Sequence, residues 1–309
     1  MSSNDTAIAS APITVDAVQR RSAGVLLGAV AVAAFSLSLP ATRAAVSGGI
    51  DPRLVAFGRA AIAGVLATGY LLAVRAPWPD RGTWRRLAVV ALGVVFGFPL
   101  LTSLALQTEG AAHGGVVIAV LPAATAVVAV LRAKERPSVV FWLASAAGTG
   151  CVLAFAVLTG SVTGGAGLSA ADLMLLGGVV LCAVGYAEGG VLARTLGGAR
   201  TICWALVLSL PVNLVLSAAV LGASGWPAAT PGAWLGLGYV SVISMYLGFF
   251  AWYAGLARGG VARIGQIQLA QPVLTLAAAA VLLDEAITAT TVIAALAVLL
   301  CVAATQRAR

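Results

Sequence analysis

The residues best suited to binding chemistry lie in an apolar stretch near the C-terminus. On a helix, Gln268, Gln271 and Thr275 fall within about 60° of one another, which predicts a polar stripe on one face. Unpaired amides are costly in hydrocarbon, so the stripe should face protein or water rather than lipid. The amides could bind a zwitterionic or polar solute, or they could hydrogen-bond neighbouring helices. Gln271 is the better candidate for solute binding because it adjoins Pro272.

This stretch has a counterpart 150 residues earlier. Glu135 follows Pro122 by thirteen residues, and Glu285 follows Pro272 at the same interval. The interval spans roughly 20 Å of helix, so each proline lies well inside a membrane-length helix whose end carries the glutamate. A proline there removes a backbone donor, which lipid tolerates only against other helices or a wet cavity. Pro122 and Pro272 therefore predict a site, although a packing kink kept after duplication would leave the same pattern. The glutamates are expected to fix helix ends.

Three ionisable side chains are candidates for proton or charge coupling. His113 titrates near neutrality, yet a histidine near an interface is often merely hydrated. Glu188 is a carboxylate within an apolar run, but it lies six residues from Arg194 and could be solvated or paired at the interface. Arg59 could face a cavity and attract carboxylates, although reaching outward to lipid headgroups is the favoured interpretation.

Aromatic side chains recur at helical spacing in the second half of the chain. Tyr239, Tyr246 and Tyr253 are seven residues apart and share one helix face, and Phe96 occupies the position in the first half that matches Tyr246. Such a stripe could line a cavity and stack on aromatic or cationic solutes. Packing, with a tyrosine at the membrane interface, is the simpler interpretation. Tyr246 and Phe96 are the candidate cavity residues of this group.

The composition predicts that these residues lie in a lipid bilayer. Hydrophobic residues make up 61% of the chain and charged residues 9%, with a mean hydropathy of +1.04. The net charge of +8 comes from cations at the ends of apolar runs rather than from one patch, so no nucleic acid partner is expected. Four cysteines lie in apolar runs without metal-ligand spacing. Because motifs for metal, acyl-transfer and phosphate chemistry are also missing, neither a cofactor nor enzyme activity is expected.

Apolar runs of helix length predict an all-α membrane protein with ten transmembrane helices. They follow a polar segment, residues 1–21, which is expected to be a disordered cytoplasmic tail. The runs occupy residues 22–45, 53–74, 86–106, 111–131, 138–158, 170–193, 201–221, 233–256, 263–283 and 287–305. Of the 18 Lys and Arg residues, only Arg43, Arg53 and Arg59 fall at the ends assigned to the outside. This distribution predicts that both termini are cytoplasmic.

The runs also predict an internal duplication. Shifting the chain by 150 residues lays the first five helices, residues 22–160, on the second five, residues 168–305. Because five is odd, the two repeats enter the membrane from opposite sides and form an inverted repeat. Pro122 and Pro272 then lie about 18 Å deep from opposite faces and meet near the midplane, where inverted-repeat carriers place their substrate.

The same segments resemble the drug/metabolite transporter superfamily, specifically the EamA type with two EamA domains. Phe35-Ser36 with Arg43 resembles the start of the first helix, where the family has Trp-Gly, and LVAFGRAAIAG with Arg59 resembles the arginine motif of the second. The proline-containing segments IAVLPAATAVVAVLRAKERPS and QIQLAQPVLTLAAAAVLLDE resemble the fourth and ninth helices. The resemblance covers residues 22–305 and rests on the order and spacing of these motifs.

The resemblance implies a secondary-type carrier for small organic metabolites that works by alternating access. It favours export of amino acids or related compounds from a bacterial inner membrane, with proton coupling as an option. The alternatives are a drug or toxic-compound transporter, a sugar-nucleotide-type transporter, or a non-transporting membrane scaffold. A scaffold would not need a polar stripe and prolines at matched depth. A channel is less favoured because no ring of charges accompanies the repeat. The sequence leaves the oligomeric state open.

Overall fold

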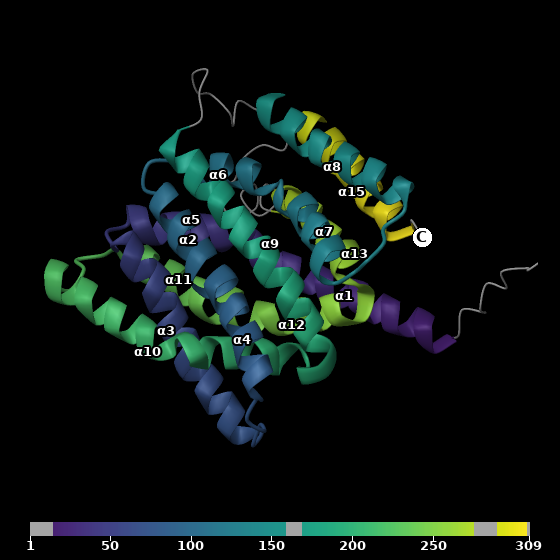
Figure 1. The fold of residues 1–309 in the computed structure, drawn as a ribbon. Coiled ribbons are helices and arrows are strands. Elements are labelled where there is room, and N and C mark those ends of the chain that lie inside the picture. Colours follow the sequence, from purple (N-terminus) through teal and green to yellow (C-terminus); the bar gives the residue numbers. More distant parts are fainter. Residues whose placement is uncertain (1–14, 159–168, 275–288, 308–309) are drawn as a thin grey trace, which may run out of the picture.

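The computed structural model describes residues 15–158, 169–274 and 289–307, and within these ranges the secondary structure is helical, with no strand (Figure 1). Six segments are long and apolar enough to cross a membrane: Ser22–Ser47, Pro52–Ala73, Arg81–Ala105, Ala170–Leu196, Gly198–Ser224 and Pro231–Gly259. An all-α membrane protein is therefore confirmed. The number of ten helices stays a prediction, because the ninth expected helix continues into residues 275–288, outside the described residues.

The helices follow one another without long connections in most of the chain. The first half contains α1 (Val15–Ser36), α2 (Ser38–Ser47), α3 (Pro52–Ala73), α4 (Arg81–Val90), η1 (Ala91–Gly97), α5 (Phe98–Ala105), α6 (Ala111–Ile118), α7 (Leu121–Arg132) and α8 (Val139–Leu158). The second half contains α9 (Ala170–Leu196), α10 (Gly198–Ser224), α11 (Pro231–Gly238), η2 (Tyr239–Gly248), α12 (Phe249–Gly259), α13 (Val261–Gly265), η3 (Gln266–Ala270) and α15 (Ala289–Arg307). Helix α1 begins inside the expected tail, and residues 1–14 lie outside the described ones.

The chain crosses repeatedly between the two ends of the helix bundle, and contacts between helices identify each end. At one end, Arg86 of α4 and Arg132 of α7 both bind Glu188 of α9. At the other end, the carbonyl oxygen of Gly48 after α2 accepts a hydrogen bond from Thr230 N before α11. We call the first the cation-rich end, because it carries Arg75, Arg81, Arg85, Lys134, Arg136, Arg194 and Arg200 in the adjoining segments. Helix α4 starts at this end and its counterpart α11 starts at the other, so these matched segments run in opposite directions.

Acidic side chains cap the first turns of helices at both ends of the bundle. The Asp51 carboxylate accepts a 2.8 Å hydrogen bond from Arg53 N at the start of α3, and the Arg53 guanidinium bound to it holds the pKa of Asp51 below its usual range. The Asp80 carboxylate accepts a 2.7 Å hydrogen bond from Thr83 N at the start of α4, which lowers the pKa of Asp80. Because caps satisfy the free N–H groups of a first helical turn, these residues fix where α3 and α4 begin.

Three apolar segments are interrupted within their described residues. Helices α1 and α2 are separated at Leu37, α6 and α7 are separated at residues 119–120, and the 3-10 turn η3 follows α13. A proline lies just after each interruption: Pro40, Pro122 and Pro272. Proline cannot donate the backbone hydrogen bond that would carry an α-helix across the break. The disruption expected at Pro122 and Pro272 is present, and Pro40 adds a third that the sequence analysis did not include.

Two further segments widen into π-helical turns at matched positions. Shifting η1 by 150 residues gives residues 241–247, which fall within η2. Such turns are rare and often occur at functional sites. Pro99, the second residue after η1, removes one α-helical donor and so favours the wider turn there. The regular α-helical hydrogen-bond pattern is thus disturbed at matched positions of the two halves.

Helices α1 and α12 cross closely through glycines. A Cβ atom added at Gly255 of α12 would meet the carbonyl oxygen of Gly24 and the nitrogen of Gly28 on α1, each at 3.1 Å. Gly24 and Gly28 on one helix, and Gly255 and Gly259 on the other, have the GxxxG spacing of tight transmembrane helix pairs. The crossing brings the break between α1 and α2 close to η2 and α12. Helices α8 and α15 pack side by side at the edge of the bundle (Figure 1).

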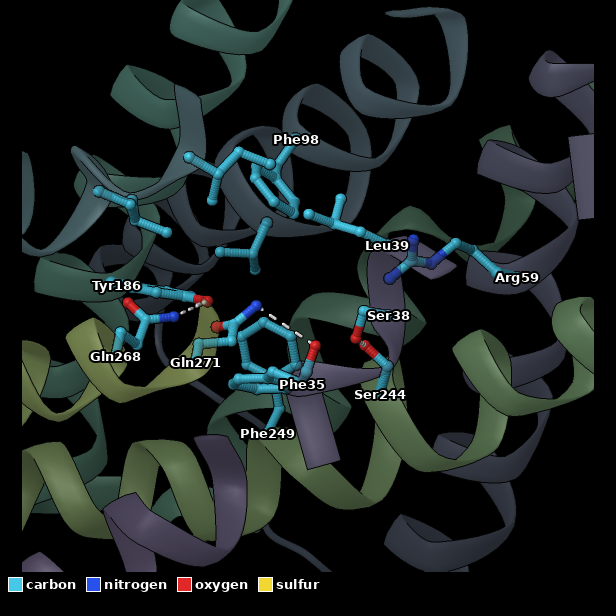
Figure 2. A pocket seen from close by; sticks show the side chains of 13 residues that line it. Phe35, Ser38, Leu39, Arg59, Phe98, Tyr186, Ser244, Phe249, Gln268 and Gln271 are labelled. Atoms are coloured by element: carbon cyan, nitrogen blue, oxygen red, sulfur yellow. Dashed lines mark hydrogen bonds between the residues drawn. The ribbon is translucent and has the colours of Figure 1, made fainter. Parts of the chain in front are cut away.

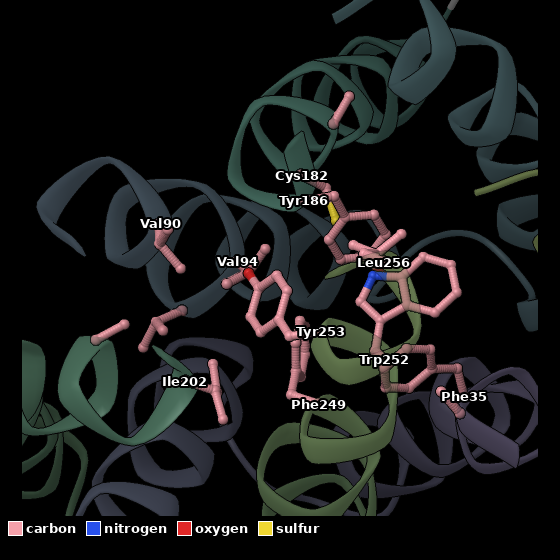
Figure 3. Packing of buried hydrophobic residues seen from close by; sticks show 14 of the residues in the cluster. Phe35, Val90, Val94, Cys182, Tyr186, Ile202, Phe249, Trp252, Tyr253 and Leu256 are labelled. Atoms are coloured by element: carbon pink, nitrogen blue, oxygen red, sulfur yellow. The ribbon is translucent and has the colours of Figure 1, made fainter. Parts of the chain in front are cut away.

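Aromatic rings fill the space beside these breaks (Figure 3). The ring centroids of Phe35 and Trp252 lie 5.9 Å apart, and those of Tyr186 and Trp252 lie 5.1 Å apart. Tyr253 is completely buried, and its hydroxyl donates a 3.1 Å hydrogen bond to the carbonyl oxygen of Gly185. The cluster therefore joins α1, α9 and α12 and gives the centre of the bundle a rigid aromatic base, although Trp252 Nε1 is buried without a hydrogen-bond partner among the described residues.

Candidate functional site

A cavity of about 40 Å³ lies where the interrupted helices meet (Figure 2). Its described lining residues are Phe35, Ser38, Leu39, Arg59, Val94, Phe98, Ile118, Leu121, Tyr186, Ser244, Phe249, Gln268 and Gln271. The volume holds a few water molecules, so any conformation that admits an organic solute must be wider. Because the lining comes from both halves of the chain and from all three proline-associated breaks, this cavity is the candidate site.

Several residues that line the cavity occupy matched positions of the internal repeat. Three pairs of lining residues are separated by 150 positions: Val94 and Ser244, Ile118 and Gln268, and Leu121 and Gln271. In each pair the first half supplies an apolar side chain and the second half a polar one. The two halves thus contribute matched backbone positions to the cavity, but the side chains at those positions differ in polarity. One part of the wall suits an apolar group, and the matching part offers hydrogen bonds.

Arg59 of α3 carries the charge of the cavity. Its side chain is buried, with 4% exposure, and its guanidinium turns toward the cavity in Figure 2. Its Nε atom has no hydrogen-bond partner, and no described residue forms an ion pair with it. The favoured expectation that Arg59 reaches outward to headgroups is wrong, because the side chain points into the bundle. A buried cation without a partner is costly, so this group is suited to binding an anion.

The polar stripe expected on the ninth helix faces the cavity. Gln268 Nε2 donates to the Tyr186 hydroxyl at 3.3 Å, and Gln271 Nε2 donates to the Phe35 carbonyl oxygen at 3.3 Å. Both residues also line the cavity, so the amides bond to neighbouring helices and remain within reach of a bound molecule. Thr275, the third member of the stripe, lies outside the described residues.

The two prolines support the cavity from behind its wall. The Pro122 carbonyl oxygen accepts a 3.1 Å hydrogen bond from Gln266 Nε2, which ties α7 to η3. Pro272 is half-buried next to the lining residue Gln271, and neither proline is among the described lining residues. Sequence reasoning missed Gln266. The close succession of Gln266, Gln268 and Gln271 in an apolar run was the available signal, since three amides there need three partners.

Hydroxyl and aromatic groups complete the cavity wall. The Oγ atoms of Ser38 and Ser244 lie 2.8 Å apart and share a hydrogen bond between α2 and η2. Phe98 lies on one side of the cavity, and Phe35 and Phe249 lie on the opposite side (Figure 2). The rings of Phe35 and Phe249 are themselves packed, with centroids 5.2 Å apart. A flat apolar group would therefore find aromatic surface on both sides of it.

Glu188 lies outside the cavity, in a buried ion cluster at the cation-rich end. Its side chain is completely buried, one oxygen is bound by Arg86, and the other is bound by Arg132 Nε at 2.5 Å. The interfacial pairing with Arg194 considered from the sequence is wrong, because Arg194 pairs instead with Glu135 at 3.0 Å. The cluster ties α4, α7 and α9 together. A role for Glu188 in charge coupling stays a prediction.

Glu135 holds the start of α13. Its two carboxylate oxygens accept hydrogen bonds from Val261 N and Ala262 N, each at 2.8 Å. A carboxylate at a helix N-terminus is favoured by the exposed N–H groups and the helix dipole. The expectation that Glu135 fixes a helix end is met, although the helix is α13 rather than its own. Glu285 lies outside the described residues.

The other predicted site residues lie away from the described cavity lining. Tyr246 packs against Phe250, with ring centroids 4.7 Å apart, and Phe96 packs against a buried cluster from α3 and α11. His113 falls in α6, but its side chain lies outside the described residues. Roles for Tyr246, Phe96 and His113 therefore stay predictions. Among the described residues, no group of three or more His, Cys, Asp or Glu side chains could hold a metal ion.

Comparison with known proteins shows the family. The model of the EamA-like transporter family matches residues 22–159 and again residues 169–305. The chain belongs to this family. It is 49% identical over 284 residues to the uncharacterized transporter YdeK of Bacillus subtilis strain 168, covering 92% of this chain and 97% of the relative. The resemblance to the drug/metabolite transporter superfamily is thereby confirmed, and the chain is a multi-pass membrane protein of a transporter family.

Two more distant matches bear on substrate and fold. The chain is 27% identical over 266 residues to the aromatic amino acid exporter YddG of Ancylobacter novellus, covering 82% of this chain and 87% of that protein. A solved crystal structure superposes with a TM-score of 0.74 at 22% identity, covering 93% of this chain and 99% of that one. The second match shows the fold alone. The fold of that structure thus extends over almost the whole of this chain.

Proposed function

We propose that this EamA-family protein is a secondary-type carrier that exports a small amino-acid-like metabolite by alternating access. In this proposal it lies in the bacterial inner membrane with both termini in the cytoplasm, as the distribution of Lys and Arg favours. The observation that carries the proposal is the cavity at the breaks of both halves, where a buried guanidinium and two amides face one enclosed space. Interrupted helices that meet near the middle of an inverted repeat are typical of carrier binding sites.

The chemistry of the cavity supports an amino-acid-like solute. Arg59 suits a carboxylate, and the three phenylalanines of the wall suit an apolar side chain. The name of the Ancylobacter novellus relative, an aromatic amino acid exporter, points to the same class. A sugar-nucleotide-type solute fits less well, because its phosphates carry several charges and Arg59 is the cation among the described lining residues. A scaffold role would leave the buried cation and the cavity without a purpose.

Growth protection tests this function. Cells that overproduce the protein are challenged with a panel of toxic amino acids and analogues, and the same cells carry Gln271→Ala or, as a control, Gln107→Ala in an exposed loop. We expect protection against at least one compound, lost in Gln271→Ala and kept in Gln107→Ala, with equal amounts of each protein in the membrane. Unchanged protection with Gln271→Ala would reject the site, and no protection by the wild-type protein against any compound would reject export of this class.

A further inference from the structure

The described lining of the cavity has a net positive charge. Arg59 is the one ionisable group among its described lining residues that is charged at neutral pH, and none of those residues is acidic. A carrier that bound an α-ammonium group by charge would place a carboxylate in its cavity, since a buried charge needs a partner of opposite sign. The described wall instead offers an ammonium group only hydroxyls, amides and aromatic rings.

Most acidic side chains elsewhere in the described structure are already engaged, and Glu109, which follows α5, is not among the described lining residues of the cavity. Asp51 and Asp80 cap helices, and Asp172 forms a capping box with Ser169 at the start of α9. Glu135 and Glu188 are held in the ion pairs at the cation-rich end. None of these groups is placed to neutralise Arg59 in the cavity. Within the part of the chain that the structure describes, no carboxylate neutralises this guanidinium, so the solute is the natural source of the anion.

The guanidinium is well suited to one kind of anion. Its planar fork matches the two oxygens of a carboxylate and forms two parallel hydrogen bonds with it. Its surroundings favour a solute that is apolar beyond that group, because Val94, Ile118 and Leu121 line the part of the wall that belongs to the first half. In Figure 2, Tyr186 and Gln268 lie across the cavity from Arg59. They could accept a polar group at the far end of such a solute.

We propose that Arg59 binds the carboxylate of the solute and that the carrier recognises its solute as a monoanion, so that an α-ammonium group contributes nothing to affinity. This inference rests on the proposed function and narrows it. The solute class is a monocarboxylate with an apolar or aromatic body, of which a neutral amino acid is one member. Deaminated relatives of such an amino acid should bind as well as the amino acid itself.

Competition in vesicles tests this with the unmodified protein. The purified protein is reconstituted into liposomes loaded with labelled L-phenylalanine, and its release is measured against three unlabelled competitors. These are L-phenylalanine, 3-phenylpropionate, which lacks the amine, and phenethylamine, which lacks the carboxylate. We expect 3-phenylpropionate to compete at least as well as L-phenylalanine, and phenethylamine to compete about tenfold to hundredfold less well, the range for losing a charge-assisted hydrogen bond.

The outcomes separate this inference from the proposed function. Two results would overturn the inference and leave export intact. In the first, unlabelled 3-phenylpropionate inhibits the release of labelled phenylalanine tenfold less well than unlabelled phenylalanine does. In the second, phenethylamine inhibits that release as well as unlabelled phenylalanine does. Absence of phenylalanine release above protein-free liposomes, together with no uptake of labelled 3-phenylpropionate, would overturn the proposed function for aromatic solutes, and with it the inference. Uptake of labelled 3-phenylpropionate without movement of phenylalanine would overturn the inference, because the proposed solute class includes the neutral amino acid.

Substitution of Arg59 provides a second test in which selectivity is compared within one protein. We expect Arg59→Glu to reverse the order, so that phenethylamine competes better than 3-phenylpropionate, and Arg59→Lys to keep the wild-type order with weaker competition. Arg53→Gln is the matched control, because Arg53 lies on the same helix, is 54% exposed and pairs with Asp51 outside the cavity. An Arg59→Glu protein that is present and active with the wild-type order of competitors would overturn the assignment.

Discussion

The buried carboxylate of Glu188 gives the sharpest test of how the cation-rich end is held together. It is completely buried between Arg86 and Arg132, whose side chains are 37% and 57% exposed. In Glu188→Gln both arginines can turn to water, so only their bonds to the carboxylate are lost. In the double variant Arg86→Met/Arg132→Met the carboxylate stays buried with no cation. The double variant should therefore be the more damaging one.

The expected magnitudes follow from this asymmetry. Leaving a buried charge without its partner costs about 3–5 kcal/mol of unfolding free energy, which we expect for the double arginine variant. The loss in Glu188→Gln should be roughly 1–3 kcal/mol, because the arginines that remain are partly hydrated. Removing all three charges should restore most of the loss and leave the triple variant within about 2 kcal/mol of the wild type, since no charge is then stranded.

Thermal unfolding of the purified protein in detergent measures this order. At about 2 °C per kcal/mol, the double variant should lose roughly 6–10 °C and Glu188→Gln roughly 2–6 °C. Arg81→Met is the control, because Arg81 is exposed at the same end, and it should change the midpoint by about 1 °C or less. If the double arginine variant unfolds no earlier than Glu188→Gln, then the carboxylate is not desolvated and this account of the cluster is refuted.

Two further predictions concern helix packing and pH. Gly255→Leu should lower the unfolding midpoint by several degrees, because even a Cβ atom at this position would meet the backbone of α1. Gly222→Leu is the control and should not lower the midpoint, because position 222 has open space around it. Equal effects of the two substitutions would refute the close approach of α1 and α12. The pKa of Asp51 is lowered in the folded protein by Arg53, so its contribution to stability is complete above the ordinary value of 3.8 and is lost as pH falls below it. The loss of stability between pH 6 and pH 3 should therefore be smaller in Asp51→Asn, and an identical loss in both proteins would contradict the assigned pKa shift.

Hydropathy and proline chemistry made much of the fold predictable. Both act locally: an apolar run of membrane length must satisfy its backbone as a helix, and a proline within it removes one donor wherever the helix lies. The all-α class, the family and the breaks at Pro122 and Pro272 were accessible for this reason. Gln268 and Gln271 were accessible as well, because two amides on one face of an apolar helix cannot point into lipid.

The direction of a side chain within the bundle was harder to predict. Arg59 was expected to reach the headgroups because its own helix gives no reason to turn it inward; the reason lies in the breaks of other helices, which create the cavity beside it. Tyr246 was grouped with other tyrosines by the 100° turn of an α-helix, and Phe96 by its match to Tyr246, yet Tyr246 lies within η2 and Phe96 within η1. A π-helical turn takes more residues, so the assumed alignment with residues a full turn away does not hold there.

The two halves share their backbone breaks but differ in the side chains that line the cavity, and these two features have different consequences for a carrier. The alternating access that we propose requires the two halves to exchange conformations, and matched breaks and matched π-helical turns would give each half the same places to bend. A site with equal chemistry on both halves would bind a solute equally well in two opposite orientations. The pairs Ile118 with Gln268 and Leu121 with Gln271 remove that degeneracy, because only one orientation places a polar group of the solute against the amides, where it can form further hydrogen bonds. Together with Arg59, whose counterpart 150 residues later is Ser209, they favour one orientation of an asymmetric solute. In the proposed carrier, specificity therefore depends on where the halves differ, and the path of movement depends on where they agree.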